Sequence, residues 1–96
     1  MEILQVVLHT PGPKWKKGID FREQPGVMEH VSFYSELQEK GKLKMGGPYL
    51  DVDSGGMMVA SADVSRKELE ELAYKDPAIV TGLLQYEVRS WFIAMK

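Results

Sequence analysis

His30 and Asp76 are the two residues whose types and setting could form an acid–base pair. His30 lies close in sequence to Phe33 and Leu37, on the apolar flank of a predicted helix, and Asp76 directly precedes Pro77. If the Asp76 carboxylate accepts a hydrogen bond from one ring nitrogen, it fixes the tautomer and leaves the other nitrogen free to act as a base or an acid. A structural interpretation stays open for each residue: a histidine packed in the core, and an Asp-Pro step that ends a helix with a turn.

Two other segments resemble parts of metal sites, and both patterns are incomplete. His9, together with His30 and a carboxylate, could form a two-histidine, one-carboxylate site. Its neighbours add no further ligands, so we expect His9 to lie near solvent at the end of a strand. Residues 51–56 resemble the start of a calcium-binding loop, but Ala62 stands where that loop requires a bidentate glutamate. The sequence therefore predicts no metal site, and it demands no cofactor.

The segment Lys14–Lys17 is basic and contains one aromatic residue, Trp15. This composition is the minimal pattern of a nucleic-acid contact. In a chain of net charge −2, so short a basic segment more often forms a solvated loop, and we expect no nucleic-acid partner. An alternative is a lid, in which Trp15 covers a pocket and the lysines face an anionic substrate.

The composition indicates a single globular domain that spans residues 1–96. Hydrophobic residues make up 44% of the chain and charged residues 27%, which is ordinary for a soluble protein. No apolar run is long enough for a membrane span, and the N-terminus lacks the basic-then-apolar pattern of a secretion signal. Cysteine is absent, which removes disulfides. We expect a cytoplasmic domain with no membrane partner.

The N-terminal half predicts a strand, a long loop and a helix. Residues 2–9 are rich in β-branched side chains and form the strand. Its alternation gives one purely apolar face, which we expect to contact the helices: Leu4, Val6 and Leu8. The loop 10–25 is long for so small a domain, so it is either functional or mobile. The helix spans about residues 25–40, and its apolar stripe comprises Val27, Val31, Tyr34 and Leu37.

The C-terminal half predicts a hairpin, a second helix and a last strand. Residues 42–45 and 57–62 form the hairpin strands, with a turn at 51–56, and the second of these strands is apolar on both faces and should be central. Ser65 and Glu68 form a capping box that opens a helix ending at Asp76. A short turn through Ile79 and Gly82 leads into the strand 83–94.

The order β-α-β-β-α-β predicts an α+β fold: a ferredoxin-like sandwich, with two helices on one face of an antiparallel four-stranded sheet. We expect the other face of the sheet to carry Ile3, Val7 and one side of the strand 57–60. That face is too apolar to be left in water by a monomer. We therefore predict a homodimer that pairs the two open sheet faces and closes a barrel.

Several fragments, taken together in their order and spacing, resemble the YciI-like (YCII-related) family of the dimeric α/β-barrel superfamily. These are His30, Gly41-Lys42-Leu43, Gly46-Gly47-Pro48, Gly55-Gly56-Met57, Asp76-Pro77, Gly82-Leu83 and Trp91. The resemblance spans roughly residues 27–92. It implies a ferredoxin-like dimer and an active site with a His–Asp pair, which matches His30 and Asp76. The segment 11–24 is longer than expected for this family, a departure that bears on the entrance of any pocket.

Three further residues are candidates for contact with a substrate. Gly47 and Pro48 follow Gly46 in a stretch where glycine permits a close backbone approach by a ligand, although a strand bulge is an equal alternative. Trp91 shares a family position and could line the cleft, or it could pack in the core or at a dimer interface.

Two classes of function follow from these residues. The first is a small dimeric enzyme in which His30, oriented by Asp76, transfers protons on a small organic acid or ring compound, as in isomerisation or elimination. The second is a non-catalytic protein whose cavity binds a small ligand. A cofactor-free monooxygenase of the same superfamily is a third alternative.

Overall fold

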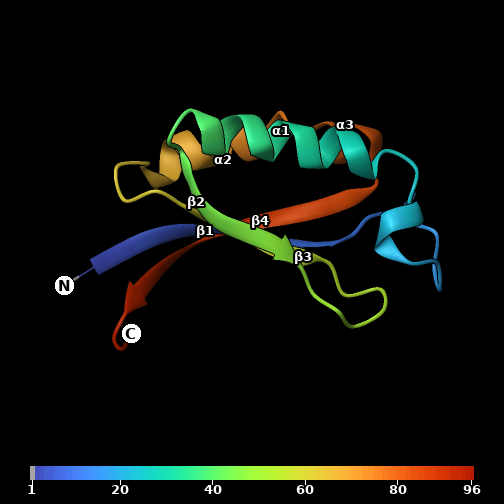
Figure 1. Ribbon diagram of the computed structural model, residues 1–96, viewed down its shortest axis with the longest axis horizontal. Coiled ribbons are helices and arrows are strands. Elements are labelled where there is room, and N and C mark those ends of the chain that lie inside the picture. The colour runs from blue at the N-terminus through green and yellow to red at the C-terminus, as the bar shows by residue number, and fades with distance from the viewer. Residues whose placement is uncertain (1) are drawn as a thin grey trace.

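The computed structural model describes residues 2–96. The elements follow in the order β1 (Glu2–Pro11), η1 (Phe21–Glu23), α1 (Val27–Glu39), β2 (Leu43–Pro48), β3 (Gly56–Ala60), α2 (Arg66–Tyr74), α3 (Pro77–Thr81) and β4 (Leu84–Ile93). All strand pairs are antiparallel, and the strand order in the sheet is β2-β3-β1-β4. The helices α1, α2 and α3 lie on one face of the sheet (Figure 1). This is the ferredoxin-like α+β arrangement, so the predicted fold is confirmed, and β3 is an inner strand as expected.

Helix α1 presents a histidine to the interior. Its buried residues are His30, Tyr34 and Leu37, which are spaced by four and three and therefore share one face. The predicted stripe instead included Val31, which is 44% exposed. The buried face is centred one residue earlier than the hydrophobic pattern indicated, and this rotation turns His30 inward.

Asp76 stands between two helices rather than between a helix and a turn. Helix α2 ends at Tyr74, and Asp76 is the N-cap of the short helix α3, which begins at Pro77. The turn predicted after Asp76 is therefore wrong, because Pro77–Thr81 is helical. An acceptor side chain followed by proline is itself a signal for a helix start, because proline tolerates the first helical position and aspartate satisfies a free N–H there.

The orientation predicted for β1 is also wrong. Val7 faces the helices, where it packs in one cluster with Ala60, Val64, Leu69, Ala73 and Val88. Leu4 and Val6 pack with Val59 on the opposite face, where Leu8, Met57 and Ile93 adjoin them. Both sets of β1 side chains are apolar enough to be buried, so hydrophobicity alone does not choose between them. The set with Val7 also contains His9, which is buried on the helix side with its Nε2 atom 3.7 Å from Asp76 Oδ2.

The open face of the sheet is only partly apolar, because the exposed Glu87 and Arg89 lie opposite Leu8 and Val6 and share their face. Its apolar residues are also other ones than those predicted. Leu4, Val6 and Leu8 take the place assigned to Ile3 and Val7. Trp91 lies opposite Leu4 in the β1–β4 pairing, so its side chain belongs to this same face.

No helix among the described residues is long and apolar enough to cross a membrane.

Candidate active site

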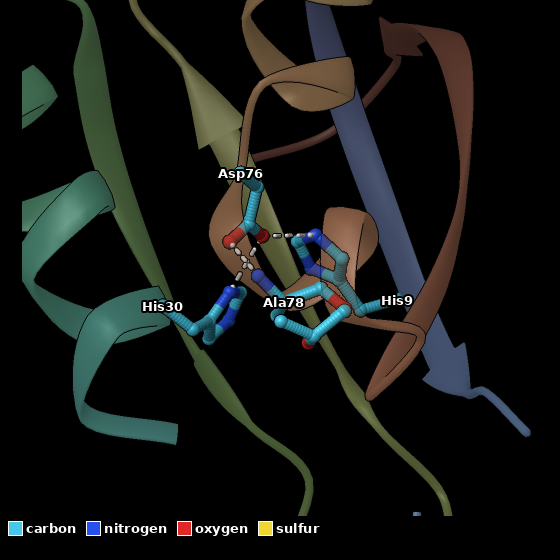
Figure 2. Close-up of polar contacts among 5 residues, drawn as sticks. His9, His30, Asp76 and Ala78 are labelled. Atoms are coloured by element: carbon cyan, nitrogen blue, oxygen red, sulfur yellow. Dashed lines mark hydrogen bonds and ion pairs between the residues drawn. The ribbon is translucent and has the colours of Figure 1, made fainter. Parts of the chain in front are cut away.

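His30 and Asp76 meet beneath the helices. The Nδ1 atom of His30 and the Oδ2 atom of Asp76 are 2.7 Å apart, a short hydrogen-bond distance (Figure 2). The Asp76 side chain has no exposure to solvent, and His30 retains 8% of its surface. When Nδ1–H donates this hydrogen bond to the carboxylate, the other ring nitrogen, Nε2, is left with a lone pair. The predicted contact between His30 and Asp76 is confirmed.

The backbone of α3 fixes the Asp76 carboxylate. Its Oδ1 atom accepts a hydrogen bond of 2.9 Å from the Ala78 N–H, while Oδ2 faces His30. The N-terminal end of a helix favours negative charge, because its first N–H groups lack partners within the helix. The two carboxylate oxygens therefore have separate tasks: one caps α3, and the other holds the imidazole.

His9 is a third member of the site. It is buried, with 2% exposure, which contradicts the expected position near solvent. Its Nε2 atom lies 3.7 Å from Asp76 Oδ2, too far for a hydrogen bond, and has no other partner (Figure 2). Burial, assisted by the nearby His30, lowers the pKa of His9 to about 4, so its ring is neutral at neutral pH.

Tyr34 completes an aromatic cluster around the two imidazoles. Its ring packs edge-on against His9 and His30, with centroids 5.6 and 5.3 Å away. Burial, together with the charge of Asp76, raises the pKa of the Tyr34 hydroxyl well above its usual value, so the group stays protonated. From the sequence, Tyr34 was predicted to be a core residue of the helix and not part of the site. Its position four residues after His30, one turn along the same helical face, was the available signal.

A cavity of about 280 Å³ opens beside His30. It is lined by His9, Trp15, Phe21, Val27, His30, Val31, Tyr34, Ser35, Gln38, Leu43, Gly46, Gly47, Pro48, Gly55, Gly56, Met57, Met58 and Leu84. An apolar cavity of roughly 150 Å³ is enough to bind benzene, so this one has room for a substituted ring. No lysine, arginine, aspartate or glutamate lines it.

The cavity includes some predicted contact residues and omits others. Gly47 and Pro48 line it, within β2, and a side chain at Gly47 would meet only open space. Trp91 does not line it and lies on the open face of the sheet instead. Trp15 lines the cavity, but the neighbouring lysines do not. The predicted lid whose lysines face an anionic substrate is therefore wrong.

His9, His30 and Asp76 are also the one group of three metal-ligating side chains that the structure brings together within residues 2–96. Their ligand atoms all lie within 4.8 Å of one another. The ligand atoms of His30 and Asp76 are 2.7 Å apart, closer than the roughly 3.3 Å between ligand atoms of a tetrahedral zinc site, so a metal would require these two atoms to move apart and to give up their hydrogen bond. The arrangement as it stands suits proton transfer better than metal binding.

Comparisons with known proteins agree with this description of the chain. The family model named YCII-related domain matches residues 5–92. The uncharacterized protein YjpA of Bacillus subtilis is 35% identical over 68 residues, which cover 71% of this chain and 78% of YjpA.

A solved structure shares the fold at low sequence identity. It is 5-chloro-2-hydroxyhydroquinone dehydrochlorinase (TftG) from Burkholderia phenoliruptrix AC1100, in complex with 2,5-dihydroxybenzoquinone. The TM-score is 0.68, the identity is 20%, and the match covers 93% of each chain. The fold of this chain therefore occurs in an enzyme that acts on a small ring compound.

Proposed function

The chain belongs to the YCII-related family, and we propose that it is a small enzyme that moves protons on a small organic substrate, with His30 as the general base and acid and Asp76 as its positioning residue. The observation that carries this proposal is the hydrogen bond of 2.7 Å between a fully buried carboxylate and an imidazole that borders a cavity. General acid–base catalysis by a positioned side chain typically contributes ~10²–10⁴ in rate, which is enough to justify a dedicated dyad.

The proposed chemistry uses the two nitrogens of His30 differently. Nε2 takes a proton from a carbon or oxygen of the substrate, and the ring becomes an imidazolium. Asp76 Oδ2 stabilises this cation through Nδ1–H without accepting the proton itself. Returning the proton to another substrate atom completes an isomerisation, and loss of a leaving group completes an elimination. The elimination is supported by the structural relative whose name describes removal of HCl from a hydroxylated ring.

The substrate is a small organic acid or a ring compound, and the lining of the cavity favours the ring. A carboxylate moved from water into this cavity would find no lysine or arginine there, and burying an unpaired charge costs several kcal/mol (~2–7 kcal/mol even for a neutral polar group without a partner). Five aromatic or imidazole rings line the cavity instead: His9, Trp15, Phe21, His30 and Tyr34. Gly47 and Pro48 would let the backbone of β2 approach the ligand closely.

The test replaces His30 by glutamine and follows turnover and stability together. Glutamine can still donate a hydrogen bond to Asp76, so the buried carboxylate keeps a partner and the melting temperature should stay nearly unchanged. Chloride release from 5-chloro-2-hydroxyhydroquinone offers a first assay, and Glu39→Gln is a matched control because Glu39 is an exposed residue of the same helix outside the cavity lining. We expect His30→Gln to lose at least ~10²-fold in kcat and Glu39→Gln to change it little.

A non-catalytic ligand-binding protein is the alternative outcome of the same experiment. If the His30→Gln variant binds ligand as the original chain does, and no substrate is consumed by either protein, the cavity serves binding alone.

We also propose that the chain forms a homodimer through the open face of its sheet. Two large side chains on this face are substantially exposed in the single chain: Trp91, at 46%, and Met45, which lies opposite Val59 and is 56% exposed. They lie beside the apolar cluster of Leu4, Val6 and Val59, whose own side chains are buried. Large apolar side chains exposed on a sheet face in this way are typical of an interface.

Sedimentation analysis tests the dimer. Trp91→Glu should convert a dimer to a folded monomer, because Trp91 is exposed before assembly and its loss leaves the core of one chain intact. Tyr74→Glu is the control, since Tyr74 is an exposed aromatic residue at the end of α2 in the helical layer. A monomer at micromolar concentration for the unmodified chain would refute the proposal.

A further inference from the structure

The long segment between β1 and α1, which contributes Trp15 and Phe21 to the cavity lining, is held by several hydrogen bonds. The Gln24 side chain, 3% exposed, accepts a hydrogen bond of 2.8 Å from the Lys16 N–H and donates to the carbonyls of Lys16 and Ile19 at 2.8 and 2.9 Å. The start of the segment is fixed by backbone bonds of 2.9 Å from Gly12 to Leu83 and from Lys14 to Gly82. These hydrogen bonds hold the loop in a defined conformation, so of the two predicted alternatives we pursue the functional one.

One side chain from the β2–β3 connection holds this loop in place. Asp53 Oδ1 accepts a hydrogen bond of 2.7 Å from Trp15 Nε1, and the Gly18 N–H donates to both carboxylate oxygens at 3.1 and 3.2 Å. The Trp15 N–H, followed by the Gly18 N–H, lowers the pKa of Asp53, so the acceptor is ionised at neutral pH. Asp53 adopts a positive φ of 58°, in the left-handed region where aspartate is one of the more common residues other than glycine.

The connection itself is anchored close to the site. Gly55 has a φ of 90°, and any side chain there would collide with the backbone of His9. The Tyr49 N–H closes the connection with a bond of 2.8 Å to the Gly55 carbonyl. In Figure 1 the η1 segment and the β2–β3 connection lie at the same end of the molecule, away from both chain termini. Asp53 therefore reaches Trp15 from a rigid base.

Trp15 also contacts the part of the structure that holds the proposed catalytic residues. Its ring packs on the cluster of Ala78, Leu83 and Leu84. The N–H of Ala78 donates the hydrogen bond to the Asp76 carboxylate. The same ring lines the cavity that His30 borders. A shift of the indole would change the size of the cavity without touching the dyad.

We propose that Trp15, clamped by Asp53, is the specificity-determining wall of this cavity and limits its ligands to compounds with a single flat ring. This inference rests on the proposed function only in taking the cavity as the ligand site, and it concerns binding rather than turnover. The aromatic lining supplies ring-to-ring contacts, and the clamp prevents the wall from yielding to a larger ligand.

The experiment compares the binding of phenol and 2-naphthol, which carry the same hydroxyl on one ring and on two fused rings. Calorimetry with the full chain should show tighter binding of phenol per heavy atom and weak binding of 2-naphthol. In Trp15→Ala, the ratio of the phenol Kd to the 2-naphthol Kd should rise at least ten-fold, about 1.4 kcal/mol of changed preference. Asp53→Ala should shift the ratio in the same direction by a smaller factor, and Asp51→Ala, an exposed acid of the same connection, should not shift it.

Each result decides the proposal. A raised ratio in Trp15→Ala and Asp53→Ala supports it. An unchanged ratio, equal loss of both ligands in a variant that keeps its melting temperature, or a chain that binds neither phenol nor 2-naphthol overturns it. If Trp15→Ala does not fold, Trp15→Phe keeps a ring but removes the hydrogen bond to Asp53, and the ratio must rise several-fold there. The measurement is of binding and needs no turnover, so a loss of turnover in His30→Gln leaves this proposal standing.

Discussion

Replacing Asp76 by asparagine should reverse the tautomer of His30. Asparagine has nearly the same shape, but it offers one acceptor oxygen and one N–H₂ donor where aspartate offers two acceptors. The Ala78 N–H, which now donates to Oδ1 at 2.9 Å, requires the amide oxygen. The amide nitrogen is then left facing His30 Nδ1, which must accept a hydrogen bond, so the ring proton moves to Nε2.

The size of each effect follows from these contacts. Asparagine caps a helix as well as aspartate does, so α3 keeps its start. Replacing a hydrogen bond to a charged group, worth about 1.5–3 kcal/mol, by a neutral one, worth about 0.5–1.5 kcal/mol, should cost about 1 kcal/mol, partly offset because a buried charge is removed. The melting temperature should fall by roughly 4–8 °C for each kcal/mol in a domain of this size. Activity should fall much further, because a protonated Nε2 cannot accept a proton; the same exchange in a serine protease triad costs ~10⁴ in kcat.

Long-range ¹H–¹⁵N NMR of the imidazoles reads the tautomer directly and needs no substrate. At neutral pH we expect His30 to carry its proton on Nδ1 in the original chain and on Nε2 in Asp76→Asn. Asp63→Asn, a change at an exposed carboxylate, should leave the spectrum of His30 as it was. If His30 keeps the Nδ1–H form in Asp76→Asn, the carboxylate does not set the tautomer and the reasoning about its role is refuted.

Two more predictions concern stability and can be checked by urea denaturation. His9 has a folded-state pKa of about 4, below its unfolded value of 6.5, so the stability that the neutral ring contributes is complete above the unfolded pKa and is lost as the pH falls toward 4; the loss amounts to about 3 kcal/mol. His9→Gln should show a smaller decrease between pH 7 and pH 4 than the original chain, and equal decreases would contradict the assignment. Gln24→Ala should lower the free energy of unfolding by about 2–4 kcal/mol, because three hydrogen bonds are lost and their backbone partners are left partly buried; a change below about 0.5 kcal/mol would mean that the loop is not held by this side chain.

The sequence was sufficient for the fold and for the central pair of residues. The order of elements, the apolar periods and the position of Gly41 after α1 all pointed to the ferredoxin-like arrangement. His30 and Asp76 were found because an imidazole on a helix and an Asp-Pro step carry recognisable chemistry. Their meeting depends on α3, whose first residue after the cap is Pro77.

The errors have a common physical origin in residues whose surroundings come from distant parts of the chain. The face of β1 was misjudged because Leu4, Val6 and Leu8 are more uniformly apolar than the set that is buried under the helices. His9 lies on the helix side close to Asp76, a neighbour from the far end of the sequence that the pattern of β1 does not indicate. The hydrogen bond between Trp15 and Asp53 could not be predicted either, because neither the basic loop nor the hairpin turn indicates which distant segment it contacts.

Proton transfer to Nε2 of His30 is the central claim, and solvent deuterium exchange tests it most directly. Resorcinol is a suitable probe because it has one ring and its ring protons exchange through a keto tautomer. In heavy water, we expect the chain to accelerate deuterium uptake by resorcinol, which ¹H NMR follows. His30→Gln should lose at least ~10²-fold of this acceleration and retain its melting temperature. An undiminished rate in the folded variant, or no acceleration by the original chain, would contradict the account.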